Sequence, residues 1–527
     1  MGPRKNHHHR ITAFADVIST LAGAIFFITI FVSAAPARCD SALPVAKTGL
    51  GEVHGVVRGN VREFLGIPYA APPVGALRWQ PPKPHEAWTG ILDTSHPGHD
   101  CPQMRFLHRG MEGSEDCLYL NVYSPDPTPE ALPVMVWIHG GTFVAGAGAW
   151  FPARNLAARG RLVVVTINYR LGALGFLANR SLDASEPQRI SSNYGLLDQQ
   201  AALRWVRESI AAFGGDPHRV TIAGESAGAI SIGLQLVSPG AAGLFDRGII
   251  ESGPFLGPLH HTRTLAEAEE RGDRFAAKLG CDKAADVAKC LRAKTTEEVL
   301  NAIPAHLLEA GELPWAPIVD GHVIPQQPAE AIAAGHFNKA PIINGSNRDE
   351  GTLFTAFSKP ITAEQYQRAV NAQAGKYAGT LLAAYPASAY PSPAQAAAAA
   401  LGDINFSCRV VKASEMLSAS VPVYEYEFDD PEAPNLSYPG ARFPLGAYHS
   451  AEIQYVFGSL EPRSVSKAQR DLSDRMIDYW TDFISFREPW QRFDASAPKI
   501  LSLAPDAIGY ESDYRKAHHC ALWDSIR

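Results

Sequence analysis

The sequence predicts an α/β fold in which helices flank a mostly parallel central sheet. Short apolar runs rich in β-branched residues recur between glycine-rich turns, as expected of buried strands, at residues 133–138, 162–167, 220–223, 248–250, 341–343 and 421–426. Helical patterns lie between several of these runs. Strands that alternate with helices in this way are typical of a parallel sheet.

The clearest helical pattern covers residues 196–213. Its apolar residues follow at spacings of three and four: Leu203, Val206, Ile210 and Phe213. Residues 262–308 are charged and rich in Ala with helical spacing, whereas residues 380–401 are rich in Ala, Pro and Ser. We expect both segments to be helical or loop excursions from a single core.

The composition is that of a globular protein with a large core. Of 527 residues, 46% are apolar and 19% are charged, which is neither a disordered nor a collagen-like composition. The 47 Lys and Arg residues against 54 Asp and Glu residues give a net charge of −7, and no basic run follows the N-terminus. This balance argues against a nucleic-acid-binding surface.

The N-terminus has the pattern of an export signal. Basic residues between Arg4 and Arg10 precede the uncharged stretch 17–37, which ends in small residues of the kind that a signal peptidase accepts. We predict a signal peptide over residues 1–37 and a single domain over residues 38–527, secreted or periplasmic and without membrane contact after cleavage. A retained membrane anchor is the less favoured alternative, since the stretch approaches the roughly 20 residues that span a bilayer.

Export would leave the cysteines oxidised. There are seven: Cys39, Cys101, Cys117, Cys281, Cys290, Cys408 and Cys520. The simplest pairing joins cysteines that are close in sequence, Cys101 to Cys117 and Cys281 to Cys290. A third disulfide, between Cys408 and Cys520, would then connect the C-terminal region to the rest of the chain. Six cysteines allow fifteen pairings, so this remains one possibility among several. Cys39 would remain unpaired or be removed.

The sharpest local motif is a Gly-x-Ser-x-Gly sequence at residues 224–228. It follows a predicted strand and precedes a stretch that can form a helix, which is the context of a nucleophile elbow with Ser226 as nucleophile. Gly224 and Gly228 would provide clearance where a Cβ would strike the adjoining strand and helix. Such a turn also directs backbone N–H groups toward the serine oxygen.

A second glycine-rich turn follows the predicted strand 133–138. Its position is that of a hydrolase oxyanion loop, so we expect the oxyanion to be held by four backbone N–H groups, those of Gly140, Gly141, Thr142 and Ala227. A plain strand-to-loop turn is the alternative.

Further segments make the chain resemble the type-B carboxylesterase/lipase family, the cholinesterase-like branch of the α/β-hydrolases, from about residue 45 to residue 523. They are residues 64–70, Arg78-Trp79, 115–121, Asn168-Tyr169-Arg170, 193–199, 213–217 and Tyr479-Trp480. The resemblance implies an α/β-hydrolase fold with helical excursions over the active-site gorge. It also implies a bacterial-type exported carboxylesterase.

The resemblance also implies two partners for Ser226. The segment Gly-Ser-Asn-Arg-Asp-Glu-Gly matches the family's acid-bearing segment and indicates Glu350, with Asp349 as the close competitor. The segment that begins at His449 matches the one that carries the family's base. The chain order of serine, acid and histidine is the order in α/β-hydrolases. The expected activity is hydrolysis of small-molecule carboxylic esters through an acyl-enzyme on Ser226, without a metal or an organic cofactor.

Other roles come from the same resemblance. It supports disulfides between Cys101 and Cys117, Cys281 and Cys290, and Cys408 and Cys520. It places Glu225 and Ser252 near the triad, although packing at strand ends explains these two nearly as well. The pairs His260-His261 and His518-His519 lack metal-ligand spacing, so we expect them on the solvated surface.

Differences from the family's usual sequence limit the range of substrates that we expect. The segment between Cys101 and Cys117 is short and contains no Trp, which argues against a cholinesterase. Thr142 occupies the position where most relatives have the third Gly of the oxyanion loop. One alternative is an esterase for large polyol or polyacid esters such as fumonisins, which would need cations such as Arg105, Arg109 or Arg154. The other is a non-catalytic, neuroligin-like binding protein, although such relatives typically lack the serine. The oligomeric state stays open.

Overall fold

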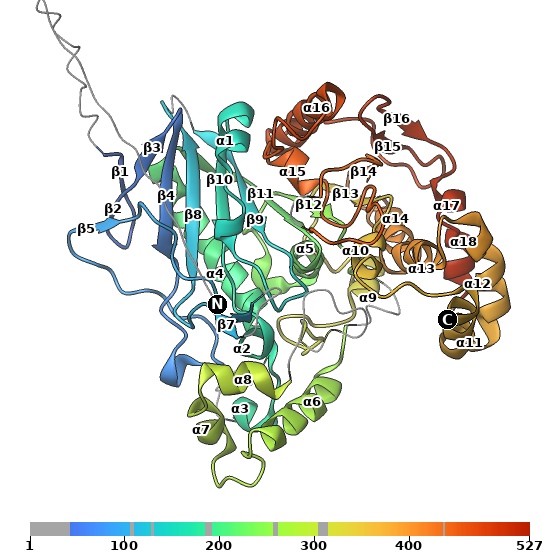
Figure 1. The fold of residues 1–527 in the computed structure, drawn as a ribbon. Coiled ribbons are helices and arrows are strands. Elements are labelled where there is room, and N and C mark those ends of the chain that lie inside the picture. Colours follow the sequence, from blue (N-terminus) through green and yellow to red (C-terminus); the bar gives the residue numbers. More distant parts are fainter. Residues whose placement is uncertain are drawn as a thin grey trace, which may run out of the picture. The chain divides into compact units, whose positions relative to one another are not determined.

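The computed structural model describes residues 43–105, 110–127, 131–184, 192–256, 262–303, 313, 315–435 and 438–526. The predicted signal peptide and Cys39 therefore lie outside the described residues. Residues 43–527 belong to one compact unit (Figure 1). Among its described residues, no helix combines the length and the apolar character needed to cross a bilayer.

Eleven strands of the described residues form one sheet, in the order β16-β15-β14-β13-β12-β11-β9-β10-β8-β4-β3 (Figure 1). The inner strands run parallel: β9 (Leu132–Ile138), β10 (Val163–Ile167), β11 (Gly215–Glu225), β12 (Arg247–Glu251), β13 (Ile342–Asn347), β14 (Val423–Phe428) and β15 (Ile500–Leu503). Every predicted run overlaps one of these strands, although three of the runs begin one or two residues earlier than the strand. The predicted mostly parallel α/β fold is therefore confirmed.

Antiparallel strands complete both ends of the sheet, which the sequence analysis did not foresee. They are β3 (Val56–Arg58), β4 (Val61–Pro68), β8 (Tyr119–Pro125) and β16 (Gly509–Glu511). Smaller sheets contain β1 (Val45–Lys47), β2 (Glu52–His54), β5 (Ile91–Asp93), β6 (Gln103–Met104) and β7 (Met111–Glu112). Gly59, at φ 64°, turns the chain between β3 and β4, and this hairpin signal was overlooked.

Two apolar cores cover the two faces of the central sheet. Because side chains alternate along a strand, Val134 and Val136 of β9 enter one core while Met135 and Trp137 enter the other. Helices α4 (Tyr194–Ser209) and α5 (Ala227–Val237) contribute to the first core. Helices α1 (Arg154–Gly160) and α16 (Lys467–Ile484) contribute to the second. Burial on both faces explains why the inner strands are continuously apolar.

The expected helical excursions leave the sheet after β12 and again after β13. The first contains α6 (Leu265–Lys278), α7 (Val287–Arg292), α8 (Thr296–Ala302) and α9 (Pro328–Ala333), and the second contains α10 (Thr352–Thr355), α11 (Ala363–Ala374), α12 (Ala378–Ala384), α13 (Pro393–Gly402) and α14 (Cys408–Leu417). Capping boxes start α6 at Thr264 and α8 at Thr295. Shorter helices are α2 (Gly172–Phe176), α3 (Arg180–Ala184), α15 (Ile453–Val456), α17 (Tyr514–Ala517) and α18 (Cys520–Ser525).

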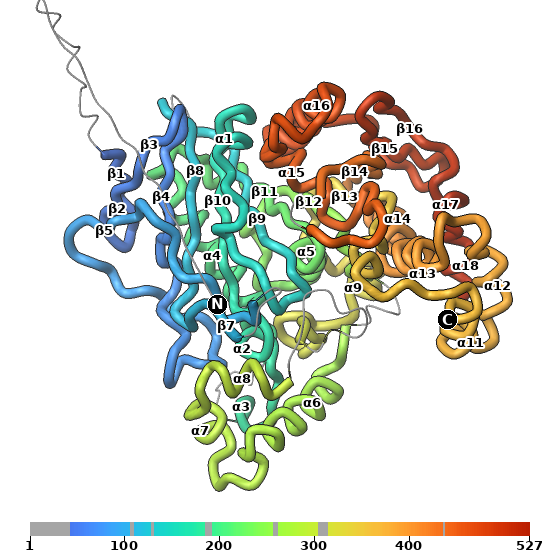
Figure 2. The backbone as a smooth tube through the Cα atoms, in the orientation of Figure 1, coloured from blue at the N-terminus to red at the C-terminus, as the bar shows by residue number. Residues whose placement is uncertain are grey.

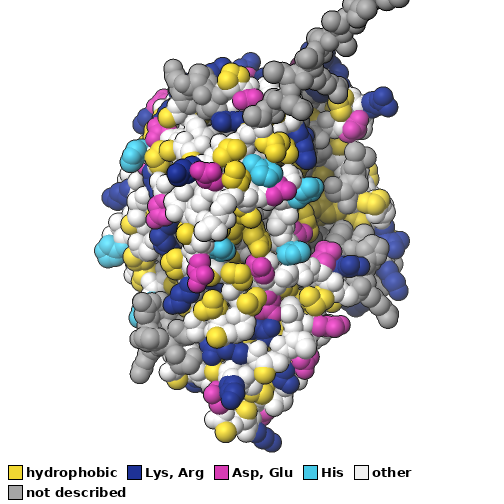
Figure 3. All heavy atoms as spheres, turned by 90° about the vertical axis from the view of Figure 1, so that its left-hand side faces the viewer, with side chains coloured by type: hydrophobic (Ala, Val, Ile, Leu, Met, Phe, Trp, Pro, Cys, Tyr) yellow, Lys and Arg dark blue, Asp and Glu magenta, His cyan; other side chains and the backbone are white. Residues whose placement is uncertain are grey.

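The surface carries both signs of charge. On the face drawn in Figure 3, Lys and Arg side chains are interspersed with Asp and Glu side chains and do not gather into a basic patch. This distribution agrees with the slight acidic excess of the composition.

Three disulfides join Cys101 to Cys117, Cys281 to Cys290, and Cys408 to Cys520. These are the pairs that the sequence and the resemblance suggested. The third connects α14 to α18 across 112 residues of chain, whereas the second closes a loop of 9 residues. The loss of loop-closure entropy in the unfolded chain is therefore largest for the third disulfide.

Removing the Cys408–Cys520 disulfide should destabilise the protein most. We expect a Cys408→Ser/Cys520→Ser variant to lose about 5 kcal/mol of unfolding free energy, against about 2.5 kcal/mol for Cys281→Ser/Cys290→Ser, because loop entropy grows with loop length. Urea unfolding of the two variants and the wild type measures this difference. Equal losses would show that loop length does not set the contribution.

Candidate active site

Ser226 lies in a sharp turn between β11 and α5, with φ 55° and ψ −121°. Few residues adopt this conformation, and it tends to occur at functional sites. A Cβ added at Gly224 would lie 2.5 Å from the carbonyl oxygen of Ile138, and one at Gly228 only 1.9 Å from the same atom. The close approach of β9 therefore requires glycine on both sides of the serine.

Adding one methyl group to this turn should disturb it. We expect Gly228→Ala to lower the unfolding free energy by about 1 to 3 kcal/mol, since the added Cβ must push β9 away. Turnover should fall as well, because Ile138 directly precedes the glycine-rich loop at residues 139–143. Denaturant unfolding and p-nitrophenyl acetate turnover measure both effects.

A matched control is Gly379→Ala in α12, where an added Cβ meets no heavy atom within 4 Å. This variant should keep wild-type turnover and should lose no stability, since Ala favours a helix more than Gly does. Wild-type behaviour of Gly228→Ala would mean that the turn is not as tight as its geometry indicates.

The structure brings His449 and Glu350 to Ser226. His449 Nε2 lies 2.9 Å from Ser226 Oγ, and His449 Nδ1 lies 2.6 Å from Glu350 Oε2. Glu350 follows β13, and its second oxygen accepts a hydrogen bond from the Asn347 backbone N–H at 2.8 Å. The competing carboxylate of Asp349 instead accepts from the Ala447 backbone N–H at 3.0 Å. Of the two candidate acids, Glu350 is the one that contacts the imidazole.

Further carboxyl groups surround the imidazole. Glu225 Oε1 lies 3.1 Å from His449 Nε2, and this side chain is buried. Burial, reinforced by the charges of Glu350 and Glu251, raises the pKa of Glu225 well above its usual range. Burial and the neighbouring carboxylates raise the pKa of Glu452 in the same way. Burial therefore disfavours the charged form of Glu225, while Glu350 is the carboxyl group that contacts His449 Nδ1.

Ser252, also expected near the triad, has φ 55° like Ser226 and is buried. Its backbone N–H donates to the Gly345 carbonyl at 2.8 Å, which ties the end of β12 to β13. Its hydroxyl has no hydrogen-bond partner among the described residues. Packing at the strand end therefore accounts for its observed contacts.

The glycine-rich loop lies directly beside Ser226. A Cβ added at Gly140 would lie 2.7 Å from Glu225 Oε2 and 3.0 Å from Ser226 Cβ. Gly141 has φ 102° and Thr142 has φ 52°, so Thr142 holds a conformation that favours glycine. Ala227 is the first residue of α5, where a backbone N–H makes no bond within the helix.

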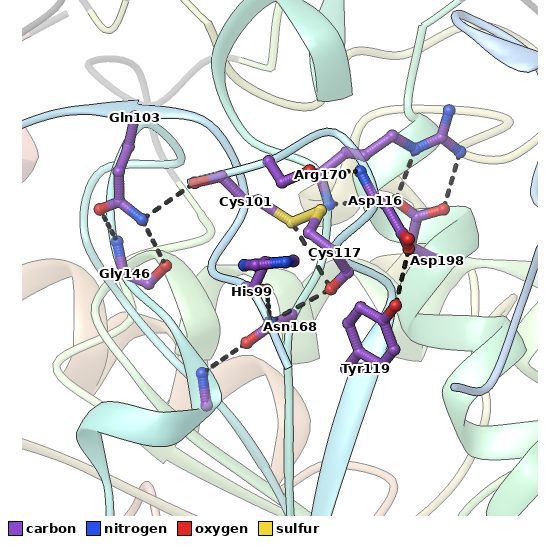
Figure 4. The surroundings of a disulfide bond; sticks show 12 residues. His99, Cys101, Gln103, Asp116, Cys117, Tyr119, Gly146, Asn168, Arg170 and Asp198 are labelled. Atoms are coloured by element: carbon purple, nitrogen blue, oxygen red, sulfur yellow. Dashed lines mark hydrogen bonds and ion pairs between the residues drawn. A yellow bond between two sulfur atoms is a disulfide. The ribbon is translucent and has the colours of Figure 1, made fainter. Parts of the chain in front are cut away.

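The Cys101–Cys117 disulfide segment braces the end of this loop (Figure 4). The Gln103 side chain donates to the Gly146 carbonyl at 3.1 Å and accepts from the Gly146 N–H at 2.9 Å. The Asn168 side chain donates to the Cys117 carbonyl at 3.1 Å and accepts from the Gly148 N–H at 2.8 Å. Side-chain amides thus connect the disulfide segment to the loop that begins at Gly140 and Gly141.

Sequence reasoning missed two aromatic residues beside the imidazole. The rings of Phe354 and Phe406 lie 5.2 Å and 4.6 Å from the ring of His449 and stack on each other at 5.8 Å. Phe354 lies four residues after Glu350, which was a usable signal. Phe406 lies much later in the same excursion, in the turn between α13 and α14, so no local pattern pointed to it.

His518 is not on the solvated surface, so this expectation was wrong. It is 5% exposed, with Nδ1 2.5 Å from Asp403 Oδ1 and Nε2 2.6 Å from Glu427 Oε1. Burial alone would lower the pKa of His518, but the hydrogen bonds to both carboxylates outweigh it and raise that pKa to about 10. The other histidine pair, at residues 260–261, lies outside the described residues.

Among the described residues, three carboxyl groups approach one another closely enough to hold a metal ion: Glu427, Asp429 and Glu511. Arg348 Nη1 lies 3.1 Å, 3.1 Å and 3.6 Å from their respective oxygens. A single guanidinium thus contacts all three carboxyl groups of this acidic cluster.

Comparison with known proteins identifies the family. Residues 42–523 match the sequence model of the Carboxylesterase family. The chain belongs to the carboxylesterase family. It is 40% identical over 442 residues to the fumonisin B1 esterase of Sphingopyxis macrogoltabida, an alignment that covers 82% of this chain and 78% of that protein. It is 36% identical over 463 residues to the para-nitrobenzyl esterase of Bacillus subtilis, covering 84% and 90%.

A solved structure titled PNB esterase is also similar to this carboxylesterase. Its TM-score is 0.76 at 34% identity, covering 91% of this chain and 99% of that one. The α/β-hydrolase fold and the family that the sequence indicated are thereby confirmed. The chain is a carboxylic ester hydrolase of the serine esterase type, and its substrates are small-molecule esters.

Proposed function

We propose that Ser226 is the nucleophile of this carboxylesterase, His449 its general base and Glu350 the acid that orients the base. The supporting observation is the hydrogen-bond chain from Ser226 Oγ to His449 Nε2 at 2.9 Å and from His449 Nδ1 to Glu350 at 2.6 Å. A serine hydroxyl is a poor nucleophile until an adjacent base takes its proton. Glu350 selects the imidazole tautomer and stabilises the imidazolium that forms.

Attack of Ser226 on the ester carbonyl forms a tetrahedral oxyanion. Backbone N–H groups of Gly140, Gly141, Thr142 and Ala227 donate to it, and losing one such donor costs about 3 to 4 kcal/mol. Collapse of the intermediate breaks the ester bond, and His449 returns the proton to the leaving alcohol. Water deprotonated by His449 then releases the carboxylic acid from Ser226. These steps need no metal and no organic cofactor.

The same proposal includes export. Residues 1–37 are removed as a signal peptide, and residues 38–527 form a single secreted or periplasmic catalytic domain. Three disulfides support this location, because such bonds persist in oxidising compartments. N-terminal sequencing of the protein from the periplasm or medium tests it. A membrane-bound protein that retains residues 17–37 would instead be anchored.

Large polyol or polyacid esters are a second candidate substrate class, favoured by the similarity to a protein named fumonisin B1 esterase. The arginines considered for binding a polyacid add no support. Arg154 Nε lies 2.5 Å from Glu63, Arg105 Nε lies 3.7 Å from Glu112, and Arg109 lies outside the described residues. Relative kcat/KM for a polyacid ester and for p-nitrophenyl butyrate separates the two substrate classes.

The deciding experiment is pre-steady-state hydrolysis of p-nitrophenyl acetate and butyrate, followed by organophosphate labelling and peptide mass analysis. We expect one adduct on the Ser226 peptide that abolishes turnover in proportion to labelling. A burst of p-nitrophenol is expected if deacylation is slower than acylation. A folded protein with neither turnover nor adduct would favour the binding-protein alternative.

A further inference from the structure

Both ring nitrogens of His518 contact carboxylates in the protein interior. This residue lies between α17 and α18, with Asp403 on Nδ1 at 2.5 Å and Glu427 on Nε2 at 2.6 Å. A histidine that donates from both nitrogens carries both protons, so the ring is an imidazolium. Arg348 also contacts Glu427, at 3.1 Å. Asp403 has His518 as its one positively charged hydrogen-bond partner among the described residues.

Asp403 begins a π-helical turn, Asp403–Ser407, that directly follows α13. Its second carboxylate oxygen accepts from the Tyr385 hydroxyl at 2.6 Å, and that hydroxyl accepts from Trp523 Nε1 at 2.7 Å. Helix α18 contacts both this π-helical turn and α17, and Figure 2 shows α17 and α18 next to each other. Single π-helical turns of this kind frequently lie at functional sites.

The π-helical turn reaches the imidazole of His449. Phe406, on this turn, has its ring centroid 4.6 Å from that of His449. Phe354 stacks on Phe406 at 5.8 Å and also contacts the His449 ring. The position of the turn therefore determines how the aromatic pair covers the imidazole.

The same segment packs against the acid without spare volume. A Cβ added at Gly351 would lie 1.9 Å from the Ala398 carbonyl oxygen of α13. A Cβ added at Gly402 would lie 3.1 Å from the Gly351 nitrogen and 3.5 Å from Glu350 Cβ. A shift of α13 and its π-helical turn must therefore also shift Glu350, because close-packed interiors transmit displacement.

We propose that His518 is a positioning residue for ester hydrolysis: its imidazolium, held between Asp403 and Glu427, fixes the π-helical turn that sets Phe406 against His449 and α13 against Glu350. The inference rests on the catalytic roles proposed for His449 and Glu350. According to this inference, efficient turnover depends on His518, a residue near the C-terminus that contacts no reacting atom.

The test compares His518→Gln with His336→Gln, an exposed histidine in the same chain. Each protein is titrated to completion with an organophosphate, so that kcat is expressed per reactive Ser226, and kcat and KM are measured for p-nitrophenyl acetate and butyrate. We expect kcat per titrated site to fall at least tenfold in His518→Gln and to stay at the wild-type value in His336→Gln. Asp403→Asn is the second variant and should lower kcat per site in the same direction.

A merely structural role predicts a different result. It would lower the melting temperature and the number of titratable sites, while each remaining site turned over normally. Normal kcat per site in both His518→Gln and Asp403→Asn therefore overturns the positioning role alone. Failure of the wild type to form a Ser226 adduct overturns the proposed function and this inference with it.

Discussion

Ser226→Ala should lower the turnover of p-nitrophenyl esters by about a million-fold, the loss typical of removing a serine nucleophile. The variant has no oxygen to attack the ester carbonyl and no site for an acyl-enzyme. Its fold should be unchanged, because the residue is small in both proteins and Ala227 still begins α5. Stopped-flow hydrolysis gives the rate, and circular dichroism with thermal unfolding gives the fold.

Ser252→Ala is the matched control. Ser252 shares the φ of 55° with Ser226, and each serine directly follows a strand of the sheet. Ser252 is buried, whereas Ser226 is partly exposed. It should keep most of its turnover and should still form an organophosphate adduct. Comparable turnover by Ser226→Ala and the wild type would remove Ser226 from its proposed role.

Glu350→Gln should lower kcat by about ten-thousand-fold, because the imidazole of His449 would lose the carboxylate that selects its tautomer. The amide is nearly the same size as the carboxylate, but it cannot stabilise an imidazolium, and its NH₂ group favours the wrong tautomer. Because His449 Nδ1 lies only 2.6 Å from Glu350, the change acts directly on the base. Steady-state kinetics over a range of substrate concentrations separates kcat from KM.

The neighbouring Asp349→Asn variant is the control for this substitution. Asn keeps an oxygen that can accept from the Ala447 N–H, which Asp349 contacts at 3.0 Å, so the loop should hold its shape and kcat should fall far less. A larger loss in Asp349→Asn than in Glu350→Gln would transfer the role of the acid to Asp349.

The inner strands of the sheet were predictable, whereas its ends were not. β9 to β15 are buried on both faces and therefore read as continuous apolar runs. In β3 and in β16, two of the three residues are exposed and the third is partly buried. Short, half-exposed strands such as β3 and β16 carry too few apolar residues to differ from loops in sequence. This reason does not apply to β4 and β8, which are longer and largely buried.

The site divides in a similar way. The Gly-x-Ser-x-Gly turn could be recognised locally, since its backbone conformation and the N-terminus of α5 depend on adjacent residues. The clearance at its glycines, however, is set by the distant Ile138 of β9. The resemblance indicated Glu350 and His449, but left Asp349 as a competitor. Backbone geometry separates the two carboxyl groups, because the chain directs Glu350 toward the imidazole and Asp349 toward the Ala447 N–H.

Sequence alone determined the family, the parallel sheet and the turn around Ser226, because burial periodicity and tight turns are properties of neighbouring residues. Only the tertiary structure decided that His518 is a buried imidazolium and that Phe406 covers His449. The partners of His518 lie 115 and 91 residues away along the chain. An isolated His-His pair is identical in sequence whether it meets water or two carboxylates, and the approach of distant segments settles which environment it has.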